Sequence, residues 1–242
     1  MLTNTTTIYW AFADVSSDNN YKDFQIRAEE PINVYKNYFK DKKIEDYEYV
    51  RCPSFRKVLH NTFGLKALFE YSFKFHKNNE VTSPDFDQSF YNNILTIRNS
   101  ENKLVSLSSP YIMIAEDKSL EMEYVPSMLE NNNFNKNAIL IPGAMDIGQY
   151  VRTLDMAFHC RTENMEIKEG DIYAYCKFKT DKKIVFKRFY WTDEIAKEVS
   201  RPVNGIKTYR NKTYKSLLWY YEKQKKLGVK KRLLKLIKEN LI

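Results

Sequence analysis

The chain has 242 residues, of which 43% are hydrophobic and 29% charged, so it can bury a core in one large domain or two small ones. Its six glycines never occur as Gly-x-Gly, and no Gly-x-x-x-x-Gly-Lys is present, which excludes the common glycine-rich nucleotide-binding motifs. Lys and Arg outnumber Asp and Glu by 39 to 31, and the aromatic fraction of 15% favours strands and thick packing layers.

The first 65 residues predict one strand and two short helices that pack on the rest of the protein. The strand is the apolar run Ile8–Ala13. Each helix opens with a proline, Pro31 or Pro53, because proline loses no hydrogen bond in the first helical turn. The second helix carries apolar residues at helical spacing, and Gly64 is placed to end it.

Residues 66–200 predict a β-rich body, because apolar residues in this part recur with a period of two. Asparagine clusters and a turn at residues 168–171 separate the strands. Many short strands with few glycines predict a mainly-β, α+β fold, either an antiparallel sandwich or a small barrel of β-clip or jelly-roll type. The strands are expected at residues 71–75, 94–98, 104–107, 111–114, 120–124, 138–141, 154–158, 172–178 and 184–191.

The positive charge is concentrated in residues 201–242, a segment predicted to be mostly helical. It carries thirteen Lys and Arg against Glu222 and Glu239, a net charge of +11 that leaves −3 of the total +8 on residues 1–200. This asymmetry indicates contact with a nucleic acid, a membrane surface or an acidic protein surface, although a solvated lysine-rich helix explains it equally well. The residues expected to contact an anionic partner are Arg210, Lys212, Lys215, Lys230, Lys231, Arg232 and Lys235.

The cysteines and histidines predict neither disulfides nor a metal site. Cys52, Cys160 and Cys176 form no Cys-x-x-Cys pair, and their odd number favours a reducing compartment. The three histidines form no pair with metal-ligand spacing, so we expect no metal and no cofactor. A signal peptide and a membrane span are not apparent, which predicts a cytoplasmic location.

Residues 141–178 contain the segment that most indicates chemistry. A Pro-Gly turn with a following acid and tyrosine precedes one strand, and a Gly-Asp turn precedes the next. The pattern resembles the superfamily of deoxyuridine triphosphatase and deoxycytidine triphosphate deaminase, whose fold is a β-clip barrel. The matching positions are Pro142, Gly143, Asp146, Tyr150, Ile167, Gly170 and Asp171.

This resemblance implies that Asp146 activates a water molecule and that Tyr150 gates a sugar pocket. The segment departs from the family pattern at two points. One extra residue separates Asp146 from Tyr150, and the family's Arg and Gln are missing after Asp171. The resemblance therefore predicts a shared arrangement of strands and turns, with a degenerate site.

A broader resemblance spans most of the chain. The residues are similar to those of a set of proteins encoded by marine tailed bacteriophages, for which no activity is assigned. This implies a phage origin and the cytoplasm of an infected bacterial host. The matching segments are Cys52-Pro53-Ser54-Phe55, Asn61-Thr62-Phe63-Gly64, Pro142-Gly143, Asp146-Ile147-Gly148, Arg152 and Ala157-Phe158.

Three functions are compatible with these patterns. The leading hypothesis is a non-enzymatic accessory protein whose basic C-terminal segment contacts an anionic partner. The first alternative is an enzyme that acts on a nucleotide or sugar, with Asp146, Tyr150 and Asp171 as catalytic residues and Arg152 and His159 as ligand-binding residues. The second alternative is a structural component of a virion or an oligomer.

Overall fold

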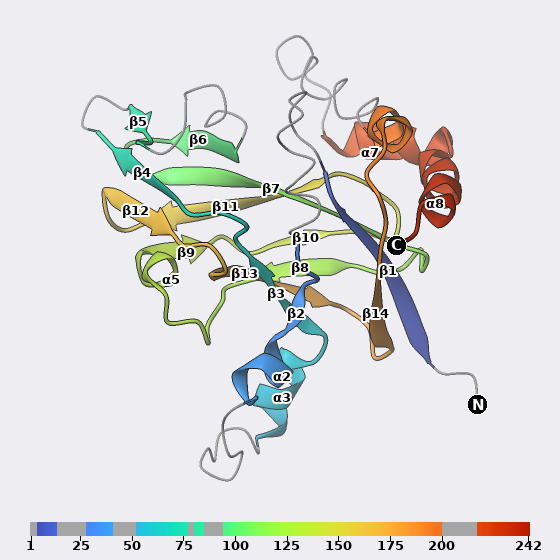
Figure 1. Ribbon diagram of the computed structural model, residues 1–242, viewed down its shortest axis with the longest axis horizontal. Helices are drawn as coiled ribbons and strands as arrows, with labels where there is room; N and C mark the ends of the chain where they lie inside the picture. Colours follow the sequence, from blue (N-terminus) through green and yellow to red (C-terminus); the bar gives the residue numbers. More distant parts are fainter. Residues whose placement is uncertain (1–3, 14–27, 41–51, 77–79, 85–93, 200–216) are drawn as a thin grey trace.

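The computed structural model describes residues 4–13, 28–40, 52–76, 80–84, 94–199 and 217–242. These residues form a mainly-β, α+β fold of three sheets with a few short helices around them (Figure 1). The predicted mainly-β, α+β class is confirmed, but the small barrel that was one of the two predicted architectures is not formed by the described residues, and the largest sheet is mixed rather than purely antiparallel. Within the described part of the chain each sheet is open, and none closes into a barrel.

The largest sheet joins strands from both ends of the chain. β1 pairs with β14 in parallel and with β7 in the antiparallel sense, so the N-terminal strand lies inside the sheet of the body. β6 also pairs with β7, beyond the main path of the sheet. In the order β14-β1-β7-β11-β9, with β6 last, the strands are Lys183–Arg188, Thr5–Phe12, Leu104–Ala115, Thr153–Cys160, Ala138–Leu140 and Leu95–Asn99.

Two smaller sheets complete the β structure. The five-stranded sheet has the order β10-β8-β13-β3-β2, with strands Gly143–Met145, Met122–Val125, Ile172–Phe178, Thr62–Lys66 and Ile32–Asn33. The three-stranded sheet has the order β12-β4-β5, with strands Asn164–Ile167, Tyr71–Phe75 and Val81–Thr82. All pairs in these two sheets are antiparallel.

The main core is built from the inward-facing residues of the sheets. Trp10 of β1, Phe158 of β11 and Phe178 of β13 are each at most 2% exposed in one apolar cluster. On β7, Met113 faces this cluster, whereas Ile112 faces the opposite side, because successive residues of a strand point to opposite faces. The large sheet therefore buries apolar residues on both faces. One face packs against the two smaller sheets, and the other packs against α8 (Val229–Glu239) and the helix over residues 193–199.

The second predicted helix is shorter than expected. α3 spans Pro53–Leu59 and ends before β3, so Gly64 lies in a strand instead of ending a helix. Phe63 and Leu65 are buried at a spacing of two residues, and this burial favours the strand. A Cβ on Gly64 would lie 2.8 Å from the Ile172 side chain, so the glycine allows β13 to pass closely.

Other strands and helices also begin or end at residues different from those predicted. The strands expected at 104–107 and 111–114 form one twelve-residue strand, β7. The helix expected from Pro31 is reduced to α2, Val34–Tyr38, preceded by two strand residues and capped by the Asn33 side chain. The asparagine cluster expected as a loop contains α5, Asn133–Asn137, and strands β5, β10 and β12 were not predicted. The predicted domain boundary after residue 65 falls inside β3.

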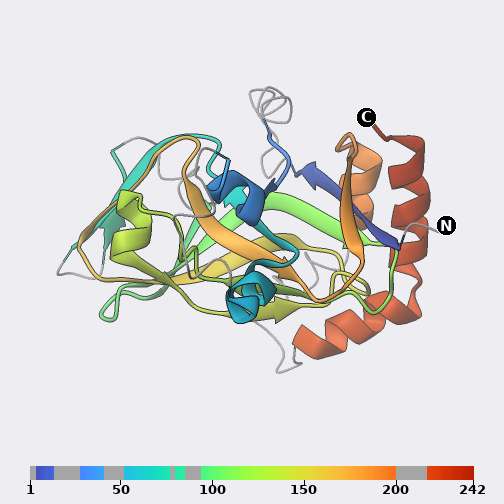
Figure 2. The same ribbon diagram turned by 90° about the horizontal axis from the view of Figure 1, so that it is seen from below.

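The C-terminal helices pack on the body. α7 spans Leu217–Lys226, and α8 spans Val229–Glu239, with Gly228 between them at a φ of 63°. Val229, Leu233 and Ile237 of α8 are buried against the outer face of β1 and β7. These helices and α5 lie at opposite ends of the molecule (Figures 1 and 2).

A further short helix precedes the C-terminal helices in the sequence. A helix over residues 193–199 is capped by Thr192, whose hydroxyl accepts a hydrogen bond from the Ile195 amide at 3.3 Å. None of the helices in the described ranges combines the length and the hydropathy needed to cross a lipid bilayer.

Candidate functional site

The turn between β10 and β11 carries three of the predicted site residues, Asp146, Tyr150 and Arg152. The amides of Gln149 and Tyr150 donate to the Asp146 carbonyl at 3.2 and 2.9 Å, which closes a helical turn. Gly148 fits against a second loop, because a Cβ there would lie 2.4 Å from the Asp117 carbonyl oxygen. This close contact fixes the position of Asp146.

The Asp146 carboxylate is half-buried and uses only one of its oxygens. Its Oδ2 accepts a hydrogen bond from Gln149 Nε2 at 2.5 Å, whereas its Oδ1 is buried without a hydrogen-bond partner. Burial raises the pKa of Asp146, although hydrogen bonds from Gln149 and Gly148 and the charge of Lys230 oppose this. The carboxyl group therefore binds a proton more readily than an exposed aspartate.

Tyr150 and Arg152 both contact Tyr221 of α7. The rings of Tyr150 and Tyr221 stack with centroids 4.3 Å apart and planes at 26°. Arg152 Nη1 donates to the Tyr221 hydroxyl at 3.2 Å, and the same guanidinium forms an ion pair with Asp155. One face of Tyr150 is thus covered by a residue from the basic C-terminal segment.

Lys230 connects α8 to the same turn. Its ammonium group donates to the Gly148 carbonyl and, at 3.2 Å, to the Glu116 carbonyl. Desolvation lowers the pKa of Lys230, and the charge of Asp146 opposes that shift. Lys238 pairs with the Glu116 carboxylate at 2.5 Å. The turn between β10 and β11, which carries Asp146 and is called the acidic turn, contacts the basic helices α7 and α8. The sequence suggested these as two separate features, but they form one interface.

The structure places His159 and Asp171 away from this interface. His159 is exposed on β11, four residues beyond Asp155, which corresponds to about 13 Å along a strand. Asp171 lies in the 168–171 turn, where its Oδ2 accepts from the Lys168 amide at 3.1 Å. It stands at the end of β13 opposite to Phe178, about 23 Å along the strand.

Phe178, at the other end of β13 from Asp171, lies on the side of the sheet where Asp146 is found. It pairs with Met122 of β8, which in turn pairs with Met145, the residue before Asp146. The length of β13 therefore separates Asp171 from Asp146. Of the five residues predicted from the enzyme hypothesis, only Asp146, Tyr150 and Arg152 come together.

The predicted anion-contacting residues fall into three groups. Arg210, Lys212 and Lys215 lie outside the described residues. Lys230 is turned toward backbone carbonyls, and Arg232 pairs with Glu198 at 3.1 Å. Lys231 and Lys235 are exposed, and within the described part of the chain neither forms an ion pair with an acid.

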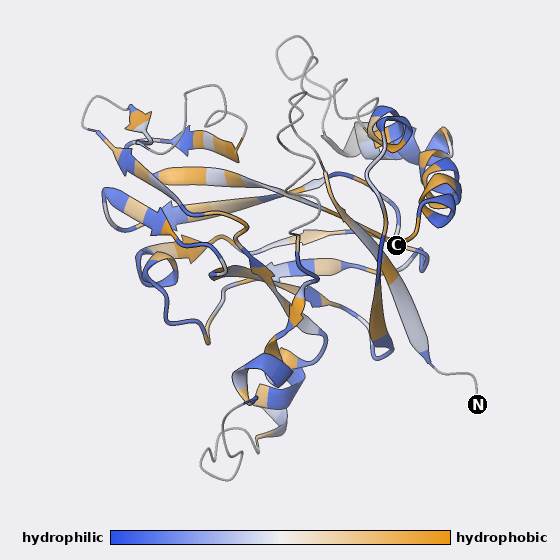
Figure 3. Ribbon diagram, viewed as in Figure 1, coloured by the Kyte–Doolittle hydropathy of each residue, from blue (hydrophilic) through white to orange (hydrophobic). Residues whose placement is uncertain are grey.

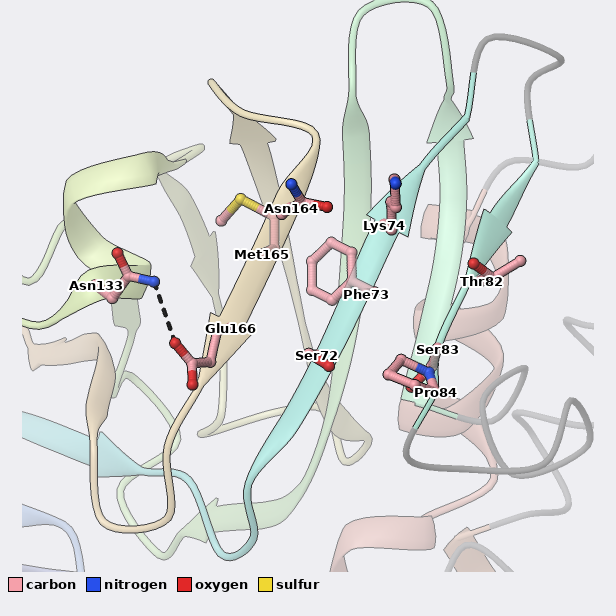
Figure 4. A pocket seen from close by; sticks show the side chains of 10 residues that line it. All are labelled: Ser72, Phe73, Lys74, Thr82, Ser83, Pro84, Asn133, Asn164, Met165 and Glu166. Atoms are coloured by element: carbon pink, nitrogen blue, oxygen red, sulfur yellow. Dashed lines mark hydrogen bonds between the residues drawn. The ribbon is translucent and has the colours of Figure 1, made fainter.

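Sequence reasoning missed a pocket on the outer face of the three-stranded sheet. It has a volume of about 480 Å³ and takes its walls from β4, β12, the end of β5 and the start of α5 (Figure 4). Polar residues alternate with apolar residues along β4 and β12, and this pattern could have indicated the pocket. Two of the three strands, β5 and β12, were not predicted from the sequence. The lining residues are Ser72, Phe73, Lys74, Thr82, Ser83, Pro84, Asn133, Asn164, Met165 and Glu166.

The cysteines and possible metal ligands add no further cluster in the described ranges. Cys160 and Cys176 are buried, and burial raises the pKa of the Cys160 thiol to about 12. Cys52 is exposed at the N-terminus of α3, where the nearby Phe55 and Ser54 amides lower its pKa. No group of three or more His, Cys, Asp or Glu side chains in the described residues is placed to hold a metal ion.

Comparison with known proteins does not assign the chain to a family. No protein-family model matches it, and no curated protein matches it. The resemblances to the deoxyuridine triphosphatase superfamily and to marine phage proteins therefore stay predictions.

Proposed function

We propose that the protein is a non-enzymatic binding protein that contacts the phosphate backbone of a nucleic acid through the outward face of α8. One observation carries this proposal. The apolar stripe of α8 is consumed by packing on the body, and lysines occupy the opposite side of the helix.

The arrangement follows from helix geometry. Val229, Leu233 and Ile237 are at most 5% exposed and define the buried side. At about 100° per residue, Lys231 and Lys235 project from the opposite side. Figure 3 shows the apolar and polar bands along this helix. The packing of the apolar stripe thus holds a lysine-bearing surface in a defined orientation.

A nucleic acid fits this surface better than a membrane or a protein. A membrane-surface helix inserts its apolar face into lipid, and that face of α8 is already buried. The centres of protein interfaces are depleted of lysine and enriched in aromatic residues. Flexible lysines that point to solvent are suited to phosphate contacts that do not depend on base sequence.

The test measures binding of fluorescently labelled single-stranded DNA, RNA and duplex DNA by anisotropy at salt concentrations from about 50 to about 200 mM. The wild type should bind more weakly as salt rises. Lys231→Glu with Lys235→Glu should weaken binding and reduce the slope of log K against log salt by about 1 for each lost contact. The matched control is Lys136→Glu with Lys168→Glu, two exposed lysines outside α8.

Three results would contradict the proposal. The first is no binding to any nucleic acid at low salt, and the second is an equal loss of binding in the control pair. The third is that the α8 lysines are needed for binding an acidic peptide or anionic vesicles but not for nucleic acid. Unchanged thermal unfolding of both double variants shows that the comparison concerns folded protein.

The enzyme hypothesis keeps one supporting observation, the raised pKa of the half-buried Asp146. Its test is a panel of nucleotides and nucleotide sugars in a thermal-shift assay, with Asp146→Asn as the variant. A ligand that stabilises the wild type but not the variant would support catalysis or binding at this turn. The coverage of Tyr150 by Tyr221 is the reason that we place this hypothesis second.

A further inference from the structure

The pocket on the outer face of the three-stranded sheet is an ordered array of polar side chains. Asn164 of β12 lies opposite Lys74 of β4, and Lys74 lies opposite Thr82 of β5, so the three form one row across the sheet. Glu166 and Ser72 form the next row. Neighbouring side chains within a row are about 5 Å apart, and the rows are about 7 Å apart.

The residues between these rows hold the array from below. Phe73 and Met165 alternate with the polar residues on their strands and are 1% and 2% exposed in the main core. Because their side chains point inward, those of Lys74 and Asn164 point to solvent. Strands that are anchored in this way hold the backbone positions of their outer residues in a nearly fixed arrangement.

Hydrogen bonds orient two of the lining groups. Asn133 Nδ2 donates to Glu166 Oε2 at 3.3 Å (Figure 4), and the Thr82 hydroxyl bonds with His76 Nε2 at 2.8 Å. Glu166 and Lys74 contribute one negative and one positive charge, so the lining residues are neutral as a set. The pocket thus offers an ammonium, a carboxylate, amides and hydroxyls without a net charge.

We propose that this pocket binds a neutral polyhydroxylated ligand, a saccharide of one to three units. Each sugar hydroxyl donates one hydrogen bond and accepts others, and the amides, the ammonium and the carboxylate supply both kinds of partner. The volume of about 480 Å³ lies within the range of small-molecule sites, about 300–1,000 Å³. This site is separate from α8 and does not depend on nucleic-acid binding.

Other ligand classes fit the pocket less well. A phosphate that contacts Lys74 would also meet the Glu166 carboxylate two residues along the neighbouring strand. A divalent cation would find Glu166 as the only carboxylate among the lining residues. An apolar ligand would desolvate the Lys74 ammonium and the Glu166 carboxylate without offering either of them a hydrogen bond. Since the pocket is open to solvent, we expect weak binding, with a Kd on the order of 1 mM.

The experiment titrates the full-length protein with neutral trisaccharides and follows backbone amide resonances by NMR. Maltotriose, cellotriose and N-acetylated chitotriose form the neutral arm, and glucuronate and inorganic phosphate form the anionic arm. We expect saturable shifts from a neutral sugar that are confined to β4, β5, β12 and the start of α5. Glu166→Gln and Lys74→Met should each raise the Kd about tenfold, because each removes a hydrogen bond to a charged group.

The matched controls are Lys168→Met and Glu169→Gln, which change the same charges on exposed residues of the adjacent β12–β13 turn. They should leave the Kd unchanged. The proposal is overturned if no sugar gives saturable shifts, if the pocket variants bind as the controls do, or if only the anionic ligands bind. Spectra of the free variants that match the wild type away from the pocket show that the fold is intact.

Discussion

The aromatic rings of Tyr150 and Tyr221 stack face to face at 4.3 Å, although 70 intervening positions separate them in the sequence. Tyr150 belongs to the turn that the sequence marked as a candidate catalytic site, and Tyr221 belongs to the basic C-terminal segment. The stack, the Arg152 hydrogen bond to Tyr221 and the Lys230 contacts join these two regions. The C-terminal helices, which include the proposed binding surface, are therefore in direct contact with the turn between β10 and β11.

The first prediction concerns the energy of this stack. A double-mutant cycle with Tyr150→Ala and Tyr221→Ala should give a coupling energy of about 0.5–1.5 kcal/mol, measured by urea unfolding. Tyr221→Phe keeps the ring and loses only the hydrogen bond from Arg152, so it should cost about 1 kcal/mol. Tyr190→Ala is the control, because Tyr190 is 57% exposed and should change stability by less than about 0.5 kcal/mol. Additive single-variant effects would show that the rings do not interact energetically.

The second prediction separates two neighbouring lysines of α8. Lys230→Met should lower the free energy of unfolding by about 1.5–3 kcal/mol, because the Gly148 and Glu116 carbonyls lose a charged donor. Lys231→Met should change stability by less than about 0.5 kcal/mol, because its side chain is exposed. In the nucleic-acid assay we expect the opposite pattern: Lys231→Met should reduce the slope of log K against log salt, whereas Lys230→Met should not. Equal effects in both assays would contradict the orientation of α8.

The third prediction tests the close approach at the acidic turn. Gly148→Ala should cost about 3 kcal/mol or more, because the new Cβ would lie 2.4 Å from a backbone carbonyl oxygen of Asp117. Gly143→Ala should cost less than about 1 kcal/mol, because its Cβ would meet the Tyr124 ring at 3.4 Å. Thermal and urea unfolding of both variants measure the difference. A stable Gly148→Ala protein would mean that the two loops are not in contact.

The fourth prediction concerns the pH dependence of stability at Asp146. Burial raises the pKa of Asp146 above its ordinary value of 3.8, so the folded state binds more protons than the unfolded state just above that pH. The free energy of unfolding contributed by this group therefore falls as pH rises through the interval between the two pKa values. Asp146→Asn should remove this contribution, and the variant should gain stability relative to the wild type as pH increases from about 4 to about 6.

Glu116 provides the matched comparison, because its pKa shifts in the opposite direction. The hydrogen bond from Lys238, together with that from Tyr9, lowers the pKa of Glu116. Its contribution to stability is present above the unfolded pKa of about 4.5 and is lost as pH falls through the folded value. Glu116→Gln should thus show its largest deficit near neutral pH. The free energy of unfolding of both variants and the wild type is measured from about pH 4 to neutral pH. As pH rises, the stability relative to the wild type should increase for Asp146→Asn and decrease for Glu116→Gln. Changes in the same direction would contradict the opposite pKa shifts of the two groups.

The candidate site shows where sequence reasoning stopped. Asp146, Tyr150 and Arg152 were predicted together because they are neighbours in one short segment, and they do share one turn. Asp171 belongs to the same motif of the resemblance, yet the length of β13 separates it from Asp146. The pocket residues Lys74, Thr82 and Asn164 lie in three segments of the chain, and only the strand register brings them into one row.

The sequence by itself determined the mainly-β composition, the apolar stripe of α8 and the charge asymmetry, because these are local properties of residue order and periodicity. The tertiary structure alone decided which cations stay exposed. Lys230 reaches the Gly148 carbonyl across 82 positions and the Glu116 carbonyl across 114, whereas Lys231, its neighbour, points to solvent. The physical reason is that a helix fixes the direction of each side chain only relative to its own axis, and the packing of Val229, Leu233 and Ile237 sets the orientation of that axis on the body.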